Sequence, residues 1–239
     1  MRSRRHIRPA AILAVTVTLV AAATALAAIK TVSRTQAAAA AQAINLRHSD
    51  VAKLSEQANP ITPSERQSNA KTTKCYGGTP DSDAYATAQS PAFTTAGQSL
   101  VSVQIESQTE ILPSAADVTH DLSAIEQQKA LACIASGLAA DARKGLTKDE
   151  TVTAPTVTRV ASVLPGFKAA FRIRVRFTIT VHSGKRKTSV NVYADEEGFA
   201  YGQAEVSMNL VETGQVPSTP LERALTELLL DRARAALGS

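Results

Sequence analysis

Eleven consecutive residues, from Phe171 to Val181, alternate strictly between apolar and polar side chains, and this run constrains the fold more than any other feature. Its apolar members are Phe171, Ile173, Val175, Phe177, Ile179 and Val181, and its polar members are Arg172, Arg174, Arg176, Thr178 and Thr180. Successive side chains of a β-strand point to opposite faces, so the run predicts a long strand with one buried face. Such a face needs other elements to cover it, which favours a layered domain.

Turn residues on both sides of this strand predict an antiparallel meander. The expected parts, in chain order, are a strand over 156–163, a turn at Leu164-Pro165-Gly166, the long strand at 168–181, a turn at Gly184-Lys185-Arg186, a strand over 188–195, a turn at Gly198 and a strand over 199–210. A further strand is expected at 101–106, where apolar and polar residues alternate again.

Two helical segments flank the meander and are expected to cover the sheet. The first is capped by Ser114 and extends to about Lys144; its two apolar sets are rotated relative to each other, so either one kinked helix or two helices fit. The second begins at Thr219, with Pro220 at the first helical position and Glu222 completing a capping box. The sequence thus predicts an α+β fold: an antiparallel sheet of about five strands with helices packed on one face, preceded by an N-terminal hydrophobic helix.

The N-terminal residues have the pattern of an export signal. Four arginines precede residues 10–29, which contain no charge, and Ala25-Leu26-Ala27 fits a cleavage site before Ala28. Because twenty helical residues also span a hydrocarbon layer of about 30 Å, a retained membrane anchor fits equally well. In either case the rest of the chain lies outside the cytoplasm, secreted or held at the plasma membrane by a single span.

Three parts follow: residues 1–29 as signal peptide or membrane anchor, 30–48 as an Ala-rich spacer, helical or flexible, and 49–239 as a single extracytoplasmic α+β domain. The formal net charge is +5, but the four N-terminal arginines account for most of it. After Ala27 there are 22 basic and 21 acidic residues, so the charge does not favour a nucleic-acid partner.

The two cysteines, Cys75 and Cys133, suit an exported chain, since an oxidising compartment favours pairing and only one intrachain disulfide is possible. Such a bridge would tether the polar, turn-rich region 59–98; two buried free thiols are the alternative. A zinc site needs more ligands than two distant cysteines, and the four histidines are scattered, so neither a metal nor another cofactor is expected.

No motif of a known catalytic class is present: the sequence lacks a nucleophile elbow, a zinc-protease helix motif, a phosphate-binding loop and a dinucleotide-binding turn. His120 and Asp121 are adjacent at a helix start, where an aspartate favours the helix dipole. Glu196 and Glu197 would point to opposite faces of a strand and are interpreted as a polar turn. We therefore expect no catalytic residues.

A basic ridge is the one constellation that suggests binding chemistry. Arg172, Arg174 and Arg176 would project from one strand face at intervals of about 7 Å, next to Lys185, Arg186 and Lys187 at the adjoining turn. Such a ridge could hold phosphate, sulfate or an anionic polymer of the cell envelope. The alternative is a solvated face whose arginines pair with carboxylates on neighbouring strands, Glu205 being one candidate.

The order of these features resembles the secreted sensor-like domains of actinobacteria, including the PknH-type extracellular domain of membrane kinases and exported proteins of PsbP-like shape. The resemblance covers about 190 residues and depends on Cys75, Cys133, Leu164-Pro165-Gly166, the strand 168–181, the strand 198–210 and the helix 219–237. It implies a ligand site in a cleft beside the sheet. The kinase-linked domains have a second disulfide, which this chain lacks, and the resemblance assigns no functional residue here.

These observations favour a non-catalytic ligand-binding or sensor-like domain of the cell envelope. Its partner would be a small molecule, a lipid or a cell-wall ligand, with the membrane as a further contact if residues 10–29 are retained. Two alternatives stay open: an envelope hydrolase whose catalytic set comes from distant residues, and a structural protein-interaction module. The oligomeric state is open as well.

Overall fold

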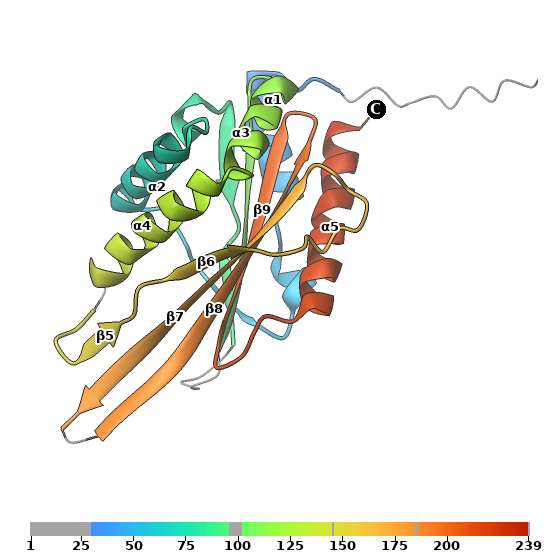
Figure 1. Ribbon diagram of the computed structural model, residues 1–239. Coiled ribbons are helices and arrows are strands. Elements are labelled where there is room, and N and C mark those ends of the chain that lie inside the picture. Colours follow the sequence, from blue (N-terminus) through green and yellow to red (C-terminus); the bar gives the residue numbers. More distant parts are fainter. Residues whose placement is uncertain (1–29, 96–101, 145, 185, 239) are drawn as a thin grey trace, which may run out of the picture.

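The computed structural model describes residues 30–95, 102–144, 146–184 and 186–238. Within them, five helices and one antiparallel sheet form the molecule (Figure 1). The helices are α1 (Arg34–Ile44), α2 (Pro63–Tyr76), α3 (Ala115–Ile125), α4 (Gln128–Lys144) and α5 (Thr219–Leu237). The strands are β1 (Ser55–Gln57), β2 (Ala86–Gln89), β3 (Ala92–Thr94), β4 (Val103–Ile111), β5 (Glu150–Val152), β6 (Thr156–Arg159), β7 (Ala170–Ser183), β8 (Arg186–Tyr201) and β9 (Ala204–Thr213). The predicted α+β class is confirmed.

The sheet has nine strands in the order β1-β3-β4-β9-β8-β7-β5, with β2 also paired to β4 and β6 to β7. The expectation of about five strands was too low. The additional strands β1, β2, β3 and β5 are only three or four residues long, and such short segments have no recognisable alternation. The expected N-terminal hydrophobic helix lies outside the described residues, and no helix among those described is long and apolar enough to span a membrane.

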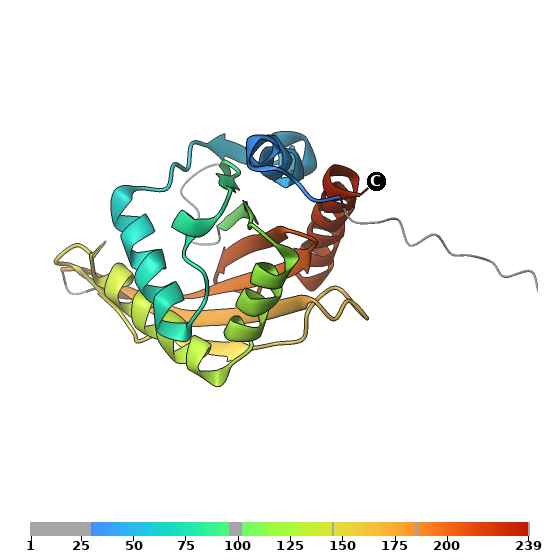
Figure 2. The same ribbon diagram turned by 90° about the horizontal axis from the view of Figure 1, so that it is seen from above.

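Helices cover both faces of the sheet, which corrects the expectation of helices on one face. In Figure 1, α5 lies on one side of the long strands and α2, α3 and α4 lie on the other, and Figure 2 shows α1 next to α5 and α2 next to α4. Of the two alternatives for the segment from Ser114 to Lys144, the structure has two helices, α3 and α4. The central strands are covered by helices on both faces, but the face toward α2 and α4 is polar. A polar face is expected in water, so the sequence predicted helices on the other face only.

The main apolar core lies between α1, α5 and one face of β4 and β9. Met208 and Leu210 of β9 pack there against Leu229 of α5, and all three side chains are fully buried. Residues 30–48 are not the expected spacer, because α1 inserts Ala37 and Ala41 into this core. Small side chains one helical turn apart let the helix approach closely, and an alanine run does not by itself distinguish such a face from a linker.

The long alternating strand is confirmed as β7, which pairs with β8 from Ala170 to Ser183. Phe171 and Ile173 are buried in a second apolar cluster with Ile125 and Leu131 of the α3–α4 region. Toward its tip the β7–β8 hairpin extends beyond the helices, and Val181 is 39% exposed (Figure 1). The alternation therefore marks burial at the base of the hairpin and partial exposure at its tip.

The expected turn at Gly198 is wrong, since β8 continues through it to Tyr201 and the chain turns at Gly202, where φ is +60°. Gly198 has another role. A Cβ atom there would lie 2.4 Å from the ring of Phe171, so the glycine makes room for the aromatic side chain on the neighbouring strand.

Candidate ligand-binding cleft

The helix α2 forms the outer wall of a cleft over the polar face of the sheet. It lies in the region expected to be irregular, and its start has a clear signal: Thr62 Oγ1 accepts from Glu65 N at 3.2 Å, and Thr62 N donates to Glu65 Oε2 at 2.7 Å. Pro63 occupies the first helical turn, and Gly77 ends the helix with φ +95°. The helix has no buried residue, so its sequence lacks the apolar stripe by which an amphipathic helix is recognised.

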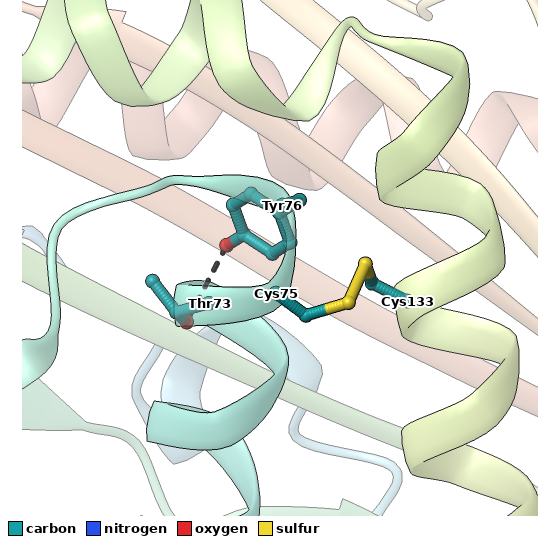
Figure 3. The surroundings of a disulfide bond; sticks show 4 residues. All are labelled: Thr73, Cys75, Tyr76 and Cys133. Carbon is teal, nitrogen blue, oxygen red and sulfur yellow. Dashed lines mark hydrogen bonds between the residues drawn. A yellow bond between two sulfur atoms is a disulfide. The ribbon is translucent and has the colours of Figure 1, made fainter.

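The contacts that join α2 to α4 include a disulfide, a close packing contact and a hydrogen bond. The predicted disulfide between Cys75 and Cys133 is present and bridges the two helices (Figure 3). Thr72 packs directly on Gly137, where an added Cβ would lie 2.5 Å from Thr72 Oγ1. Ser68 Oγ donates a hydrogen bond of 2.6 Å to Asp141 Oδ2. The two helices therefore form one unit over the sheet.

The floor of the cleft consists of polar side chains on β4, β8 and β9. Their register places Glu110 directly opposite Glu205, Gln108 opposite Ser207 and Glu196 opposite Asn209. A sheet face covered by helices is ordinarily apolar, because it is removed from water. This one is polar across three adjacent strands.

Between floor and roof lies a cavity of about 320 Å³. It is lined by Ser68, Asn69, Thr72, Thr73 and Tyr76 of α2, by Ile125, Ile134, Gly137, Leu138 and Asp141 of α3 and α4, by Asp81, and by the floor residues Gln108, Glu110, Glu196, Glu205, Ser207 and Asn209. The lining thus contains five carboxylates and, among the residues that the structure describes, no lysine, arginine or histidine. Its net charge is negative when these groups are ionised.

Three glutamates on the floor of the cleft have raised pKa values. Burial, followed by repulsion from Asp81, raises the pKa of Glu110 to about 7, although Gln108 Nε2 donates to it at 2.6 Å. Burial, followed by repulsion from Glu110, raises the pKa of Glu205 to about 8. Burial also raises the pKa of Glu196. In the described part of the chain, Glu196 and Glu205 have neither a hydrogen-bond partner nor an ion-pair partner. The floor therefore holds protons near neutral pH.

One wall of the cleft is apolar and aromatic. Tyr76, Ile125 and Ile134 belong to the cluster beneath α3 and α4 and also line the cavity. Burial raises the pKa of the Tyr76 phenol, whose hydroxyl donates to Thr73 Oγ1 at 3.5 Å (Figure 3). Tyr76 therefore stays neutral and presents an aromatic surface next to the carboxylates.

The residues of the predicted basic ridge lie away from this cleft. Arg172 is buried under α5, where its Nη2 donates to Asp195 Oδ2 at 2.6 Å and to Glu222 Oε2. Arg174 donates to both oxygens of Asp195, at 2.7 and 2.5 Å. Arg176 is exposed, with its guanidinium 5.7 Å from the centre of the Tyr193 ring.

The rest of the ridge lies at the tip of the β7–β8 hairpin. Arg186 and Lys187 are exposed there, whereas Lys185 lies outside the described residues. Glu205, one candidate partner of the ridge arginines, faces the cleft instead. Arg172 and Arg174 thus pair with carboxylates, which was the alternative for this ridge, and an anion site on the ridge of Arg172, Arg174, Arg176, Lys185, Arg186 and Lys187 stays a prediction.

The sequence does not indicate which carboxyl groups pair with Arg172. Asp195 lies on β8 opposite Arg174, and Glu222 comes from the first turn of α5, where it faces inward instead of completing the expected capping box. Burial, followed by repulsion from Asp195, raises the pKa of Glu222 to about 8. Only the register of β7 and β8 could have suggested the pairing of Arg174 with Asp195.

Glu196 and Glu197 do point to opposite faces, as expected, but they lie within β8 and not in a turn. Glu196 faces the cleft, whereas Glu197 is buried on the α5 face, where Ser162 Oγ donates to it and Val163 N donates at 3.1 Å. Burial raises the pKa of Glu197 to about 7.

His120 and Asp121 position the segment that follows α2. Asp121 Oδ1 accepts from Thr79 N at 2.7 Å, and His120 Nε2 lies 3.0 Å from the Gly77 carbonyl oxygen. No group of three or more His, Cys, Asp or Glu in the described ranges is placed to hold a metal ion.

No protein-family model matches the chain, and no curated protein matches its sequence. Among solved structures, the extracellular domain of PknH from Mycobacterium tuberculosis is similar, with a TM-score of 0.41 and 12% identity over 86% of this chain and 98% of that chain. The TM-score and the sequence identity are both low, so this similarity assigns no function to the chain.

Proposed function

We propose that this chain is an extracytoplasmic, non-catalytic ligand-binding domain and that the cleft between α2, α4 and the sheet is its binding site. The observation that supports this most strongly is the polar floor of a helix-covered sheet, which encloses a cavity of about 320 Å³. Carboxyls under a roof of helices cost stability unless a partner satisfies them. A ligand is the partner that the fold itself does not supply.

The disulfide supports the proposed location outside the cytoplasm. Disulfides persist in oxidising compartments and are rare in the cytosol. Cys75 and Cys133 are the only cysteines of the chain, and both take part in this bridge. The disulfide also holds α2 at the cleft. An oxidising compartment, which keeps the disulfide intact, therefore also keeps this wall of the cleft in place.

The lining indicates which ligands fit. Carboxylates without basic neighbours attract a cation and repel an anion, and Tyr76 offers an aromatic face for a positively charged group. Ile134 and Leu138 would contact the apolar part of such a molecule. The cavity is at the small end of the range for small-molecule sites. We therefore propose a small amine-bearing ligand.

The experiment that tests this uses three probes of one length that differ in charge: putrescine, butanediol and succinate. Isothermal titration calorimetry of the oxidised domain should show binding of putrescine, affinity at least about tenfold weaker for butanediol, and none for succinate. Equal binding of succinate, or no binding of putrescine, would refute the proposal.

Matched variants locate the site. Glu205→Gln removes one floor charge with little change in shape, and we expect it to weaken putrescine binding by about tenfold. Glu227→Gln removes the same charge from an exposed position on α5, across the sheet from the cleft, and should leave the affinity unchanged. Equal losses in the two variants would mean that putrescine responds only to overall charge.

A second candidate function is acid–base catalysis, and one observation favours it. Glu110 and Glu205 are directly opposed on neighbouring antiparallel strands, which brings two carboxyls with raised pKa values close together. A pair of carboxyls on either side of a scissile bond is the arrangement of most glycoside hydrolases. Release of reducing ends from cell-wall glycan by the wild type, and its loss in Glu110→Gln, would favour catalysis over binding alone.

A further inference from the structure

The attachment of α2 differs from that of the other elements around the cleft. The helix has no fully buried residue, and Tyr76 at its end packs only half-buried against the cluster beneath α3 and α4, so burial of apolar side chains contributes less to its docking than to that of the core elements. Besides the disulfide, the described contacts of α2 with α4 include the Ser68–Asp141 hydrogen bond and the packing of Thr72 on Gly137. The wall of the cleft therefore depends on its covalent link far more than the core elements do.

The two cysteines of this link differ in exposure. Cys75 is an exposed residue of α2, whereas Cys133 is a buried residue of α4. A thiolate from solution can reach the sulfur of Cys75, while the Cys133 side is shielded. The bridge is thus open to thiol–disulfide exchange from one side.

We propose that the Cys75–Cys133 disulfide is a redox-controlled latch that keeps the cleft closed, and that its reduction by a dithiol frees α2 while the rest of the domain stays folded. In the first step a thiolate of the dithiol attacks Cys75 Sγ, forms a mixed disulfide and releases Cys133 as a thiolate. The second thiol of the reductant then displaces Cys75. Two electrons pass to the protein, which gains two thiols, and the dithiol becomes a disulfide.

The consequence for binding rests on the proposed function. Five of the residues that line the cavity belong to α2, among them Tyr76, which supplies the aromatic wall. Hydrogen bonds hold the chain on both sides of α2: before it, Asn59 Nδ2 donates to Glu106 Oε2 of β4, and after it, Thr79 N donates to Asp121 Oδ1 of α3. Between these points α2 would move as a flap, and an open flap leaves the ligand with only the floor.

Hydrogen–deuterium exchange tests the latch without any ligand. After reduction with dithiothreitol, verified by the mass gained on alkylation of a parallel sample, amides of residues 63–76 should lose protection by at least about tenfold. Amides of β9 and α5 should keep theirs. The double variant Cys75→Ser/Cys133→Ser should show the same pattern without reductant, and Ser68→Ala, which removes one hydrogen bond, should change the exchange much less.

Two results would overturn the latch. Unchanged protection of residues 63–76 in the fully reduced protein would show that α2 docks without the bridge. Loss of protection throughout β9 and α5, or a double serine variant that does not fold, would show that the bridge holds the whole domain together. A separate titration with putrescine should show weaker binding after reduction. If the oxidised protein does not bind putrescine, the proposed function fails, and the latch is still judged by the exchange data.

Discussion

The two faces of the central strands β4, β8 and β9 differ in what covers them and in what they bury. Toward α5, β9 presents Val206, Met208 and Leu210, which are fully buried. Toward α2 and α4, the same strand presents Glu205, Ser207 and Asn209. Both faces lie under helices, but only the first has the composition of a core. The comparison suggests that one face stabilises the fold and that the other is kept polar for a ligand.

Buried charge separates the faces in the same way. On the α5 face Asp195 is paired with Arg172 and Arg174, so its charge is compensated within the protein. On the cleft face Glu110 and Glu205 face each other without a cation among the described residues. We interpret the paired Asp195 as structural, and Glu110 and Glu205, which become charged only above neutral pH, as available to bind a cation.

The largest loss of stability is expected from Arg172→Met. Removing this guanidinium leaves the carboxylates of Asp195 and Glu222 buried with less compensation, which costs about 3–5 kcal/mol in comparable buried pairs. Arg176→Met, on the exposed part of the same strand face, should cost less than about 1 kcal/mol. Urea unfolding measures the loss in free energy of unfolding for each variant. Equal losses would show that the buried Arg172 contributes no more to stability than the exposed Arg176.

A smaller but still large effect is expected from Leu229→Ala. This side chain is fully buried between α5 and the sheet, and such truncations cost about 2–5 kcal/mol. Leu138→Ala makes the same change at the rim of the cleft, where the leucine is 39% exposed, and should cost less than about 1 kcal/mol. Thermal unfolding of the two variants compares the faces directly, and a larger loss for Leu138 would reverse our assignment of the core.

The pH dependence of stability should be governed by the raised pKa values. The carboxyls of Glu110 and Glu197 have pKa values of about 7 in the folded state, and those of Glu205 and Glu222 have values of about 8. Between the ordinary glutamate value and these values, the folded state binds more protons than the unfolded state. The free energy of unfolding therefore falls as the pH rises, by up to about 1.4 kcal/mol per pH unit for each such group.

Chemical unfolding across this window measures the slope, which should be negative between about pH 5 and about pH 8. Glu205→Gln should make the slope shallower, because the amide does not titrate. A stability that rises with pH over this window would contradict the raised values.

The smallest effect on stability is expected from Glu205→Gln itself at about pH 8, and its sign is opposite to that of the core variants. Removing one of two facing carboxyls relieves their repulsion, so the variant should be more stable by about 1 kcal/mol. Differential scanning calorimetry at this pH would detect the gain. A loss of stability would show that Glu205 has a structural partner in the fold.

Part of this structure was predictable because an element buried on one side has apolar residues at regular intervals in its sequence. The alternation of β7 follows from its apolar residues, whereas the two rotated apolar sets of α3 and α4 indicated a change of direction without distinguishing a kink from a break. The floor of the cleft was not predictable in this way. Glu205, Ser207 and Asn209 alternate with apolar residues, which is equally the pattern of a strand with one face in water.

The polar face becomes a cleft because α2 covers it. This helix is polar and has no apolar stripe, so no local sequence pattern predicts that it packs over the sheet. The position of Arg172 was missed for a related reason. A charged residue on an alternating strand is expected in solvent, and its buried partner Glu222 lies 50 residues away in the chain. Pairings of this kind depend on the tertiary arrangement and not on any segment.

The most direct test of the account is the affinity of the oxidised domain for putrescine at about pH 6 and about pH 9. A cation favours the ionised form of Glu110 and Glu205, whose pKa values lie between these two pH values. Binding should therefore be at least about tenfold tighter at the higher pH and should release protons near neutral pH. An affinity that does not change with pH, or that is tighter at the lower pH, would contradict the claim that the uncompensated carboxyls of the cleft bind the ligand.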